Sequence, residues 1–106
     1  MPLICRQGDP LTTGHDNCDT TSTLDTPGQS TVYVEGKLIA RKGDSTVSHN
    51  HQTGTDGEGD PICSPHTAAI TGSSSTVYVG GALVARVGDA VDDGTLTAGA
   101  EKVYCG

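Results

Sequence analysis

Histidine and cysteine side chains carry the metal-binding chemistry of this 106-residue chain, which has four of each. The step Cys63-Ser-Pro-His66 places a thiolate and an imidazole close enough for one metal ion. Two further histidines, His15 and His49, follow the Gly-Asp steps at residues 8–9 and 43–44 by similar intervals. Structural zinc sites take four N or S ligands in a tetrahedron. We therefore predict a structural metal site formed by His15, His49, Cys63 and His66, with zinc as the ion and iron as the alternative.

Two other side chains compete for places in this site. His51 lies two residues beyond His49 and could replace it, and Cys18 is a weaker candidate. A single histidine in a polar loop is usually only solvated. All four histidines, however, lie in polar segments outside the apolar runs, and this grouping favours metal binding.

The cysteines allow a second interpretation. Two disulfides among four cysteines could form in three ways. The first residues, Met-Pro-Leu-Ile-Cys-Arg, lack the charged leader and apolar run of a secretory signal. We therefore expect synthesis in a reducing cytosol without a signal peptide, which favours metal ligation or buried free thiols over disulfides.

Composition and motifs exclude several function classes. The net charge of −7 argues against nucleic acid and anionic membrane surfaces, which attract clustered Lys and Arg. The longest apolar stretch is too short to span a bilayer. Four protein ligands would close the metal site, whereas a catalytic zinc keeps one position open. With no HExxH motif or nucleophile elbow, a zinc hydrolase is disfavoured, and we assign no catalytic residue.

The core that this composition can build is small. The chain has no Trp or Phe, three Tyr and one Met, although aromatic side chains usually supply much of a small core. Zinc binding contributes about 10–16 kcal/mol in small metal-dependent peptides. Whole domains have net stabilities of about 5–15 kcal/mol. One bound ion could therefore replace the missing core volume.

An internal repeat organises the chain. Residues 30–44 and 75–89 are identical at eleven of fifteen positions, at an offset of 45. Each copy is a run rich in Val and Tyr, a two-residue step containing Gly, and a second apolar run, which is typical of a β-hairpin. Turns at residues 35–36 and 80–81 predict the pairs Val34–Lys37, Tyr33–Leu38, Val32–Ile39, Tyr78–Leu83 and Val77–Val84.

The two ends of the chain supply a third copy. Residues 3–9 match the returning strand of residues 38–44, and residues 102–106 match the outgoing strand. The third hairpin would pair Tyr104 with Leu3 and Val103 with Ile4. In that register Cys5 and Cys105 are not opposite one another, so we expect no bridge between them. We predict one all-β domain over residues 1–106, with three hairpins closed in pseudo-three-fold symmetry and little or no helix.

These repeats resemble the PAAR-repeat proteins, which tip the spikes of type VI secretion systems and contractile phage tails. The resemblance lies in Leu-Ile-Ala-Arg-Lys-Gly-Asp at 38–44, Leu-Val-Ala-Arg-Val-Gly-Asp at 83–89 and Leu-Ile-Cys-Arg-Gln-Gly-Asp at 3–9. The family often carries a Cys after the position of Asp89, where this chain has Asp92-Asp93-Gly94. We expect Cys63 to fill that vacancy.

The resemblance implies a pointed cone with a metal at its apex. Its base would cap a trimeric β-helical spike of the VgrG or phage-hub type in a 1:3 complex, and its point would pierce the target membrane. The protein would be made in the bacterial cytoplasm and carried out on a virion tail or a secretion spike. An adaptor that docks a separate effector is the alternative. The sequence identifies neither the machine nor the residues that contact the spike.

Overall fold

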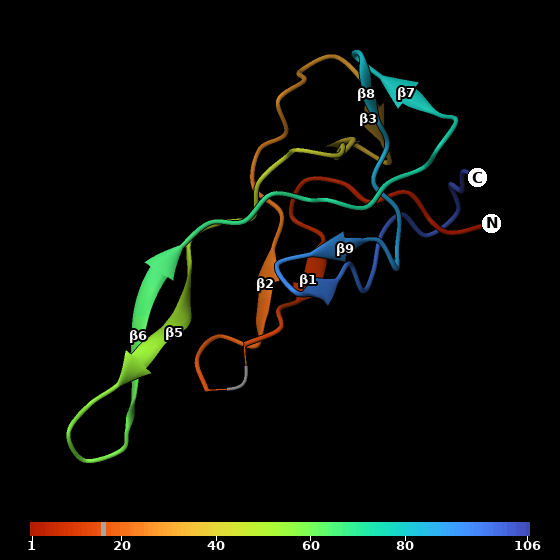
Figure 1. Ribbon diagram of the computed structural model, residues 1–106. Helices are drawn as coiled ribbons and strands as arrows, with labels where there is room; N and C mark the ends of the chain where they lie inside the picture. Colours follow the sequence, from red (N-terminus) through yellow and green to blue (C-terminus); the bar gives the residue numbers. More distant parts are fainter. Residues whose placement is uncertain (16) are drawn as a thin grey trace.

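The structure, a computed structural model, describes residues 1–15 and 17–106 and contains short antiparallel strands without a helix in that part of the chain (Figure 1). No helix among the described residues could therefore cross a membrane. The strands form five two-stranded sheets. Their bounds are β1 Pro10–Thr12, β2 Thr21–Thr23, β3 Tyr33–Val34, β4 Lys37–Leu38, β5 His49–Thr55, β6 Pro61–His66, β7 Tyr78–Val79, β8 Ala82–Leu83, β9 Ala90–Val91 and β10 Gly94–Thr95.

The β3–β4 and β7–β8 hairpins have the predicted register. Tyr33 pairs with Leu38, and Tyr78 pairs with Leu83. Both residues of the first turn have positive φ angles, 53° at Glu35 and 82° at Gly36. Two successive positive φ angles define the type I′ turn, whose twist suits hairpin strands. The turn chemistry read from the repeat is thereby confirmed.

The third hairpin closes where the two chain ends meet. Leu3 bridges Tyr104, and the Ile4 amide donates to the Val103 carbonyl at 2.9 Å. Figure 1 shows the N- and C-termini side by side. The predicted pairing of the ends is therefore confirmed.

A closed ring of hydrogen bonds joins the three returning strands. The Cys5 amide donates to the Ala85 carbonyl, the Ala85 amide to Ala40, and the Ala40 amide to Cys5, each at 3.0 Å. All three side chains are fully buried. Small residues are needed here because three strands approach a common axis. This ring defines the pseudo-three-fold axis that the repeat predicted.

Each returning strand ends in an Arg-x-Gly-Asp turn. Gly8, Gly43 and Gly88 have φ angles of 85°, 95° and 94°, which glycine adopts without steric cost. In all three turns the Asp amide donates to the Arg carbonyl at 3.0 Å, and the Asp carboxylate accepts from the Arg amide. The Gly-Asp steps are thus the sharp changes of direction that the sequence indicated.

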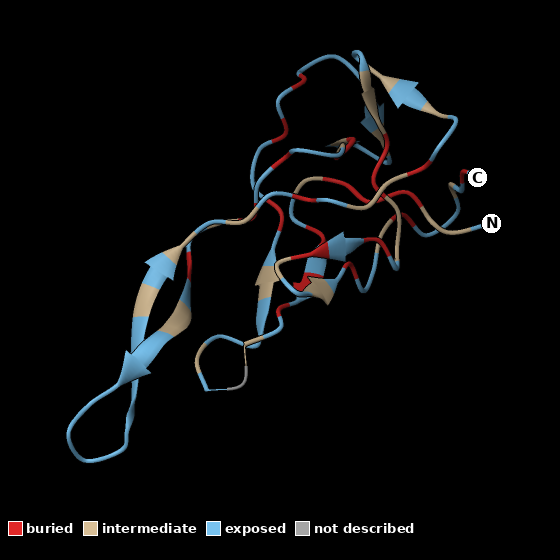
Figure 2. Cartoon of the chain, in the orientation of Figure 1, coloured by how far each residue is buried: buried red, intermediate tan, exposed pale blue. Residues whose placement is uncertain are grey.

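Buried apolar side chains, red in Figure 2, form two clusters. The first joins the three ring residues to Leu11, Leu24, Ile70, Val91 and Leu96, and the second consists of Ile4, Ile39, Val84 and Cys105. Three backbone β-bridges join the segments that carry the first cluster: Leu24–Thr46, Ile70–Val91 and Leu11–Leu96. Cys5 and Cys105 are free thiols and are buried, as expected. Burial, aided by the charges of Asp9 and Asp89, raises the pKa of the Cys5 thiol to about 12. That thiol is therefore unreactive at neutral pH.

One long hairpin projects from this core and was not predicted. Strands β5 and β6 pair from His49–His66 to Thr55–Pro61, with a bulge between Gln52 and Gly54. The Asp56 carboxylate caps the turn by accepting the amides of Glu58 and Asp60. The hairpin is largely exposed (Figure 2). The molecule measures 48 × 24 × 22 Å.

Glu35 links the first hairpin turn to the two ends of the chain, and its contacts predict how the stability of the protein depends on pH. Its carboxylate accepts the amides of Glu101 and Lys102 at 3.0 and 3.1 Å and pairs with Arg6 at 3.0 Å. The Glu101 amide, with Lys102 and Arg6, holds the pKa of Glu35 below its ordinary value of 4.5. A lowered folded-state pKa stabilises the protein above pH 4.5, and this stabilisation disappears as the pH falls through the folded pKa.

Glu35→Gln should therefore melt below wild type at pH 7, and the difference should shrink as the pH is lowered from 4.5. Thermal melts at several pH values measure it. Glu58→Gln, in the exposed β5–β6 turn, is the matched control and should show no such difference. An equal difference between Glu35→Gln and wild type at every pH would contradict the assignment.

Candidate metal centre

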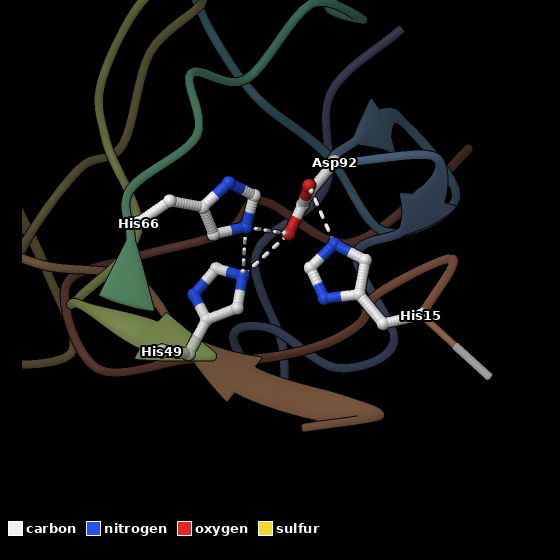
Figure 3. A group of neighbouring side chains, drawn as sticks. All are labelled: His15, His49, His66 and Asp92. Atoms are coloured by element: carbon white, nitrogen blue, oxygen red, sulfur yellow. Dashed lines mark hydrogen bonds and ion pairs between the residues drawn. The ribbon is translucent and has the colours of Figure 1, made fainter. Parts of the chain in front are cut away.

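Four side chains converge on one point at the base of the β5–β6 hairpin. The ligand atoms of His15, His49, His66 and Asp92 all lie within 4.8 Å of one another (Figure 3). His15 Nε2 is 3.1 Å from Asp92 Oδ1, and His66 Nε2 is 3.2 Å from Asp92 Oδ2. His49 Nε2 also lies against Asp92 Oδ2 and is 3.0 Å from His66 Nε2. Three imidazoles therefore surround one carboxylate.

Each of these side chains is held by a different part of the fold. His49 begins β5 and His66 ends β6, and the two form a cross-strand pair. His15 follows β1 in the loop that leads to β2. Asp92 begins the turn between β9 and β10, where it and Asp93 have φ angles of 49° and 61°. Left-handed backbone is uncommon outside glycine, and here it begins the turn that carries the Asp92 carboxylate into the cluster.

Backbone contacts at the far ring nitrogens orient two of the imidazoles. His15 Nδ1 is 3.2 Å from the Asn50 carbonyl, and His49 Nδ1 is 3.0 Å from the Val47 carbonyl. A carbonyl can only accept, so Nδ1 carries the proton and Nε2 presents a lone pair. Metal-binding histidines commonly have this second hydrogen bond.

The donor atoms fit a divalent cation. With Nδ1 protonated, His49 Nε2 is an acceptor that faces two other acceptors, Asp92 Oδ2 and His66 Nε2. Only a proton or a cation between them makes this arrangement favourable. Ligand atoms ~2.0–2.1 Å from zinc lie about 3.4 Å apart in a tetrahedron. Three separations in the cluster, of 3.0–3.2 Å, are close to that value, and all of its ligand atoms lie within 4.8 Å of one another.

Charge and burial favour an ionised Asp92 carboxylate and a neutral His66 imidazole. Burial alone would raise the pKa of Asp92, but the proximity of His49, His15 and His66 outweighs it and lowers that pKa. Burial lowers the pKa of His66, and the proximity of the His51 and His49 rings lowers it further, against the opposing effect of Asp92. An ionised carboxylate and a neutral imidazole are the forms that bind metal.

The structure corrects the prediction for Cys63. This residue forms a disulfide with Cys18 and is not among the four converging side chains. The reason is strand geometry: side chains alternate between the two faces of a strand, so residues three apart on β6, such as Cys63 and His66, face opposite ways. The expectation that disulfides would be disfavoured is wrong for this pair. The predicted residues His15, His49 and His66 are brought together.

Asp92 takes the place that had been given to Cys63. The sequence contained a signal for it, since Asp92 lies at the loop position where the resembling family often carries a cysteine ligand. His51, the alternative to His49, lies outside the group of four. Its ring instead stacks on His66 with centroids 3.9 Å apart and planes at 5°. It lines an open pocket of about 310 Å³ with Gly14, His15, Gln52, His66, Asp92 and Asp93.

Comparison with known protein families gives a match over most of the chain. The sequence model described as PAAR motif matches residues 19–96, which is most of the chain and includes two of the three Arg-x-Gly-Asp turns. A search of curated proteins gives no match.

Proposed function

Because the chain belongs to the PAAR-motif family, we propose that it is the structural tip of a membrane-piercing spike in a contractile injection machine. It would cap a trimeric β-helical spike with one copy per three spike chains. It would be carried on a virion tail or on a secretion spike and would meet the target membrane only during penetration. Its role would be mechanical rather than catalytic.

The observation that carries this proposal is the three-fold arrangement of exposed tyrosines. Tyr33, Tyr78 and Tyr104 hold equivalent places in the three hairpins and are 59%, 63% and 53% exposed. Strands β3 and β7, which begin at Tyr33 and Tyr78, and the C-terminus near Tyr104 lie away from the projecting β5–β6 hairpin (Figure 1). A trimer has three equivalent sites at its end, so one chain with three equivalent tyrosines can contact all three alike.

The candidate metal centre supports the same role. It ties the loop after β1, the β5–β6 hairpin and the β9–β10 turn to one another. We propose that His15, His49, His66 and Asp92 hold zinc, with iron as the alternative. Four protein ligands leave no open position for a reacting water in a tetrahedral site, so the ion would be structural and would fasten these three segments together. Elemental analysis identifies the ion.

The spike complex gives a direct test. Light scattering after gel filtration should show one chain bound to one spike trimer at micromolar concentration. Replacing all three tyrosines by serine should weaken the complex about 100-fold or more, since a buried interface aromatic costs about 2 kcal/mol or more when truncated.

Ile62 provides the matched control. It is an exposed apolar residue, 44% accessible, on strand β6 of the projecting hairpin. Ile62→Ser should bind the spike as well as wild type does. Absence of any wild-type complex would overturn the spike-tip proposal, and equal binding by the triple tyrosine variant would overturn the assignment of the contact surface.

A further inference from the structure

The Cys18–Cys63 disulfide joins two segments that each carry a side chain of the candidate metal centre. Cys18 follows His15 by three residues, and Cys63 precedes His66 by three. The two cysteines are 45 residues apart in the chain, with Cα atoms 6.0 Å apart. The disulfide therefore fastens the loop of His15 to the strand of His66, on the face of β6 opposite to the imidazole.

The other contacts between this loop and the hairpin include hydrogen bonds at the surface, among them the one between His15 Nδ1 and the Asn50 carbonyl at 3.2 Å. Asp19 and Asn50 exchange two of them, with the Asn50 amide donating to the Asp19 carboxylate at 2.8 Å and the Asp19 amide donating to the Asn50 carbonyl at 3.2 Å. The Asn17 amide group donates to the side chain of Gln52 at 2.8 Å. Water competes for exposed hydrogen bonds, so each contributes little net stability. The disulfide adds a covalent link to these weaker contacts and restrains His15 relative to His66.

We propose that the Cys18–Cys63 pair is a redox latch on the metal centre: its oxidation pre-organises the four side chains and raises their affinity for a divalent cation. Cys63 is exposed, so a small-molecule disulfide can reach it. One cysteine thiolate attacks the small disulfide and releases one thiol. The other cysteine then displaces the second thiol, so two cysteine thiols are oxidised while one disulfide is reduced to two thiols. This inference rests on the proposed metal centre.

The effect on metal affinity follows from pre-organisation. In the reduced protein the ion itself must order the loop of His15, and this ordering lowers the affinity. Supports outside the ligand shell typically change metal affinity by 10–100-fold. We expect the oxidised protein to bind zinc about tenfold more tightly than the reduced protein, at the lower end of that range.

Linkage makes the effect reciprocal. If oxidation raises zinc affinity tenfold, zinc stabilises the oxidised form by the same factor. A tenfold change in a two-electron equilibrium corresponds to about 30 mV. Saturating zinc should therefore lower the reduction potential of the disulfide by about 30 mV.

The full-length protein tests both directions. Zinc affinity is measured by competition with a chromophoric chelator, for the oxidised protein and for the Cys18→Ser, Cys63→Ser and double variants. Each single variant removes the disulfide, so the double variant should lose no more affinity than either one. The potential is measured on wild type in glutathione buffers with and without zinc, with the thiols counted by alkylation. This second measurement does not depend on how the variants fold.

The outcomes separate this inference from the metal centre itself. A tenfold affinity loss with equal single and double variants, together with a zinc-dependent potential, supports the latch. Equal zinc affinity in both redox states, or a potential that zinc does not change, overturns the latch and leaves the metal centre standing. Absence of zinc binding in either redox state overturns the metal centre and the latch with it.

Discussion

Replacing His66 by alanine is expected to remove the metal ion and to lower the melting temperature by about 15 °C or more. His66 Nε2 lies 3.0 Å from His49 Nε2 and 3.2 Å from Asp92 Oδ2, so its loss opens the predicted tetrahedron. An ion present at a thousand times its dissociation constant stabilises the folded state by about 4 kcal/mol. At this chain length each kcal/mol corresponds to about 4 °C or more. Elemental analysis and thermal melts measure the two effects.

His51 supplies the matched control. It has the same side chain, is close in sequence to His49 and stacks on the His66 ring, but lies outside the converging group. His51→Ala should keep one ion per chain and a melting temperature close to that of wild type. A second comparison uses protein stripped of metal, in which His66→Ala and wild type should melt together. Among the described residues, the half-buried His66 ring hydrogen-bonds only to His49 and Asp92 of the same cluster.

Two results would contradict the proposed centre. One is a wild-type protein that contains no metal after purification and after incubation with zinc or iron. The other is a His66→Ala protein that keeps its ion while His51→Ala loses it, which would exchange the roles of the two stacked rings.

The hairpins and their closure could be predicted from the sequence because the determining interactions are local or repeated. The turn at Glu35-Gly36 requires particular residues at adjacent positions, and its register follows from the turn alone. The pairing of Leu3 with Tyr104 spans the whole chain. The sequence still indicates it, because both ends repeat a pattern that occurs intact at residues 30–44 and 75–89.

The projecting hairpin and the fourth converging side chain could not be predicted in the same way. Strands β5 and β6 have no counterpart in the other two repeats, so no pattern shows them. Without knowing that residues 61–66 form a strand, the odd spacing of Cys63 and His66 looks like a chelating pair. Asp92 joins the histidines only because the β9–β10 turn lies against the loop after β1, where the Gly14 amide donates to the Asp92 carbonyl at 2.9 Å. That contact depends on the assembled ring.

Strand β10 packs so closely against β1 that we expect Gly94→Ala to be strongly destabilising. A methyl group at Gly94 would overlap the Thr12 carbonyl oxygen and lie 2.6 Å from its carbon. Both obstacles are backbone atoms of β1, so no side chain can rotate away, and β10 must separate from β1. Overpacking typically costs about 1–3 kcal/mol and more where backbone has to move. We expect a loss of about 3 kcal/mol, or more than 10 °C in melting temperature, measured by thermal and denaturant unfolding.

Gly54→Ala is the control for the loss of a glycine in a strand. Gly54 lies in β5, has no positive φ and has no atom within 4 Å of the added methyl group. The change should leave stability equal or raise it by about 0.4–1 kcal/mol, because alanine restricts the unfolded chain. Gly94→Ala should also weaken zinc binding, because Gly94 directly follows the turn that presents Asp92. Equal melting of the two variants would show that β1 and β10 do not pack this closely, and it would remove the reason for placing Asp92 beside the three histidines.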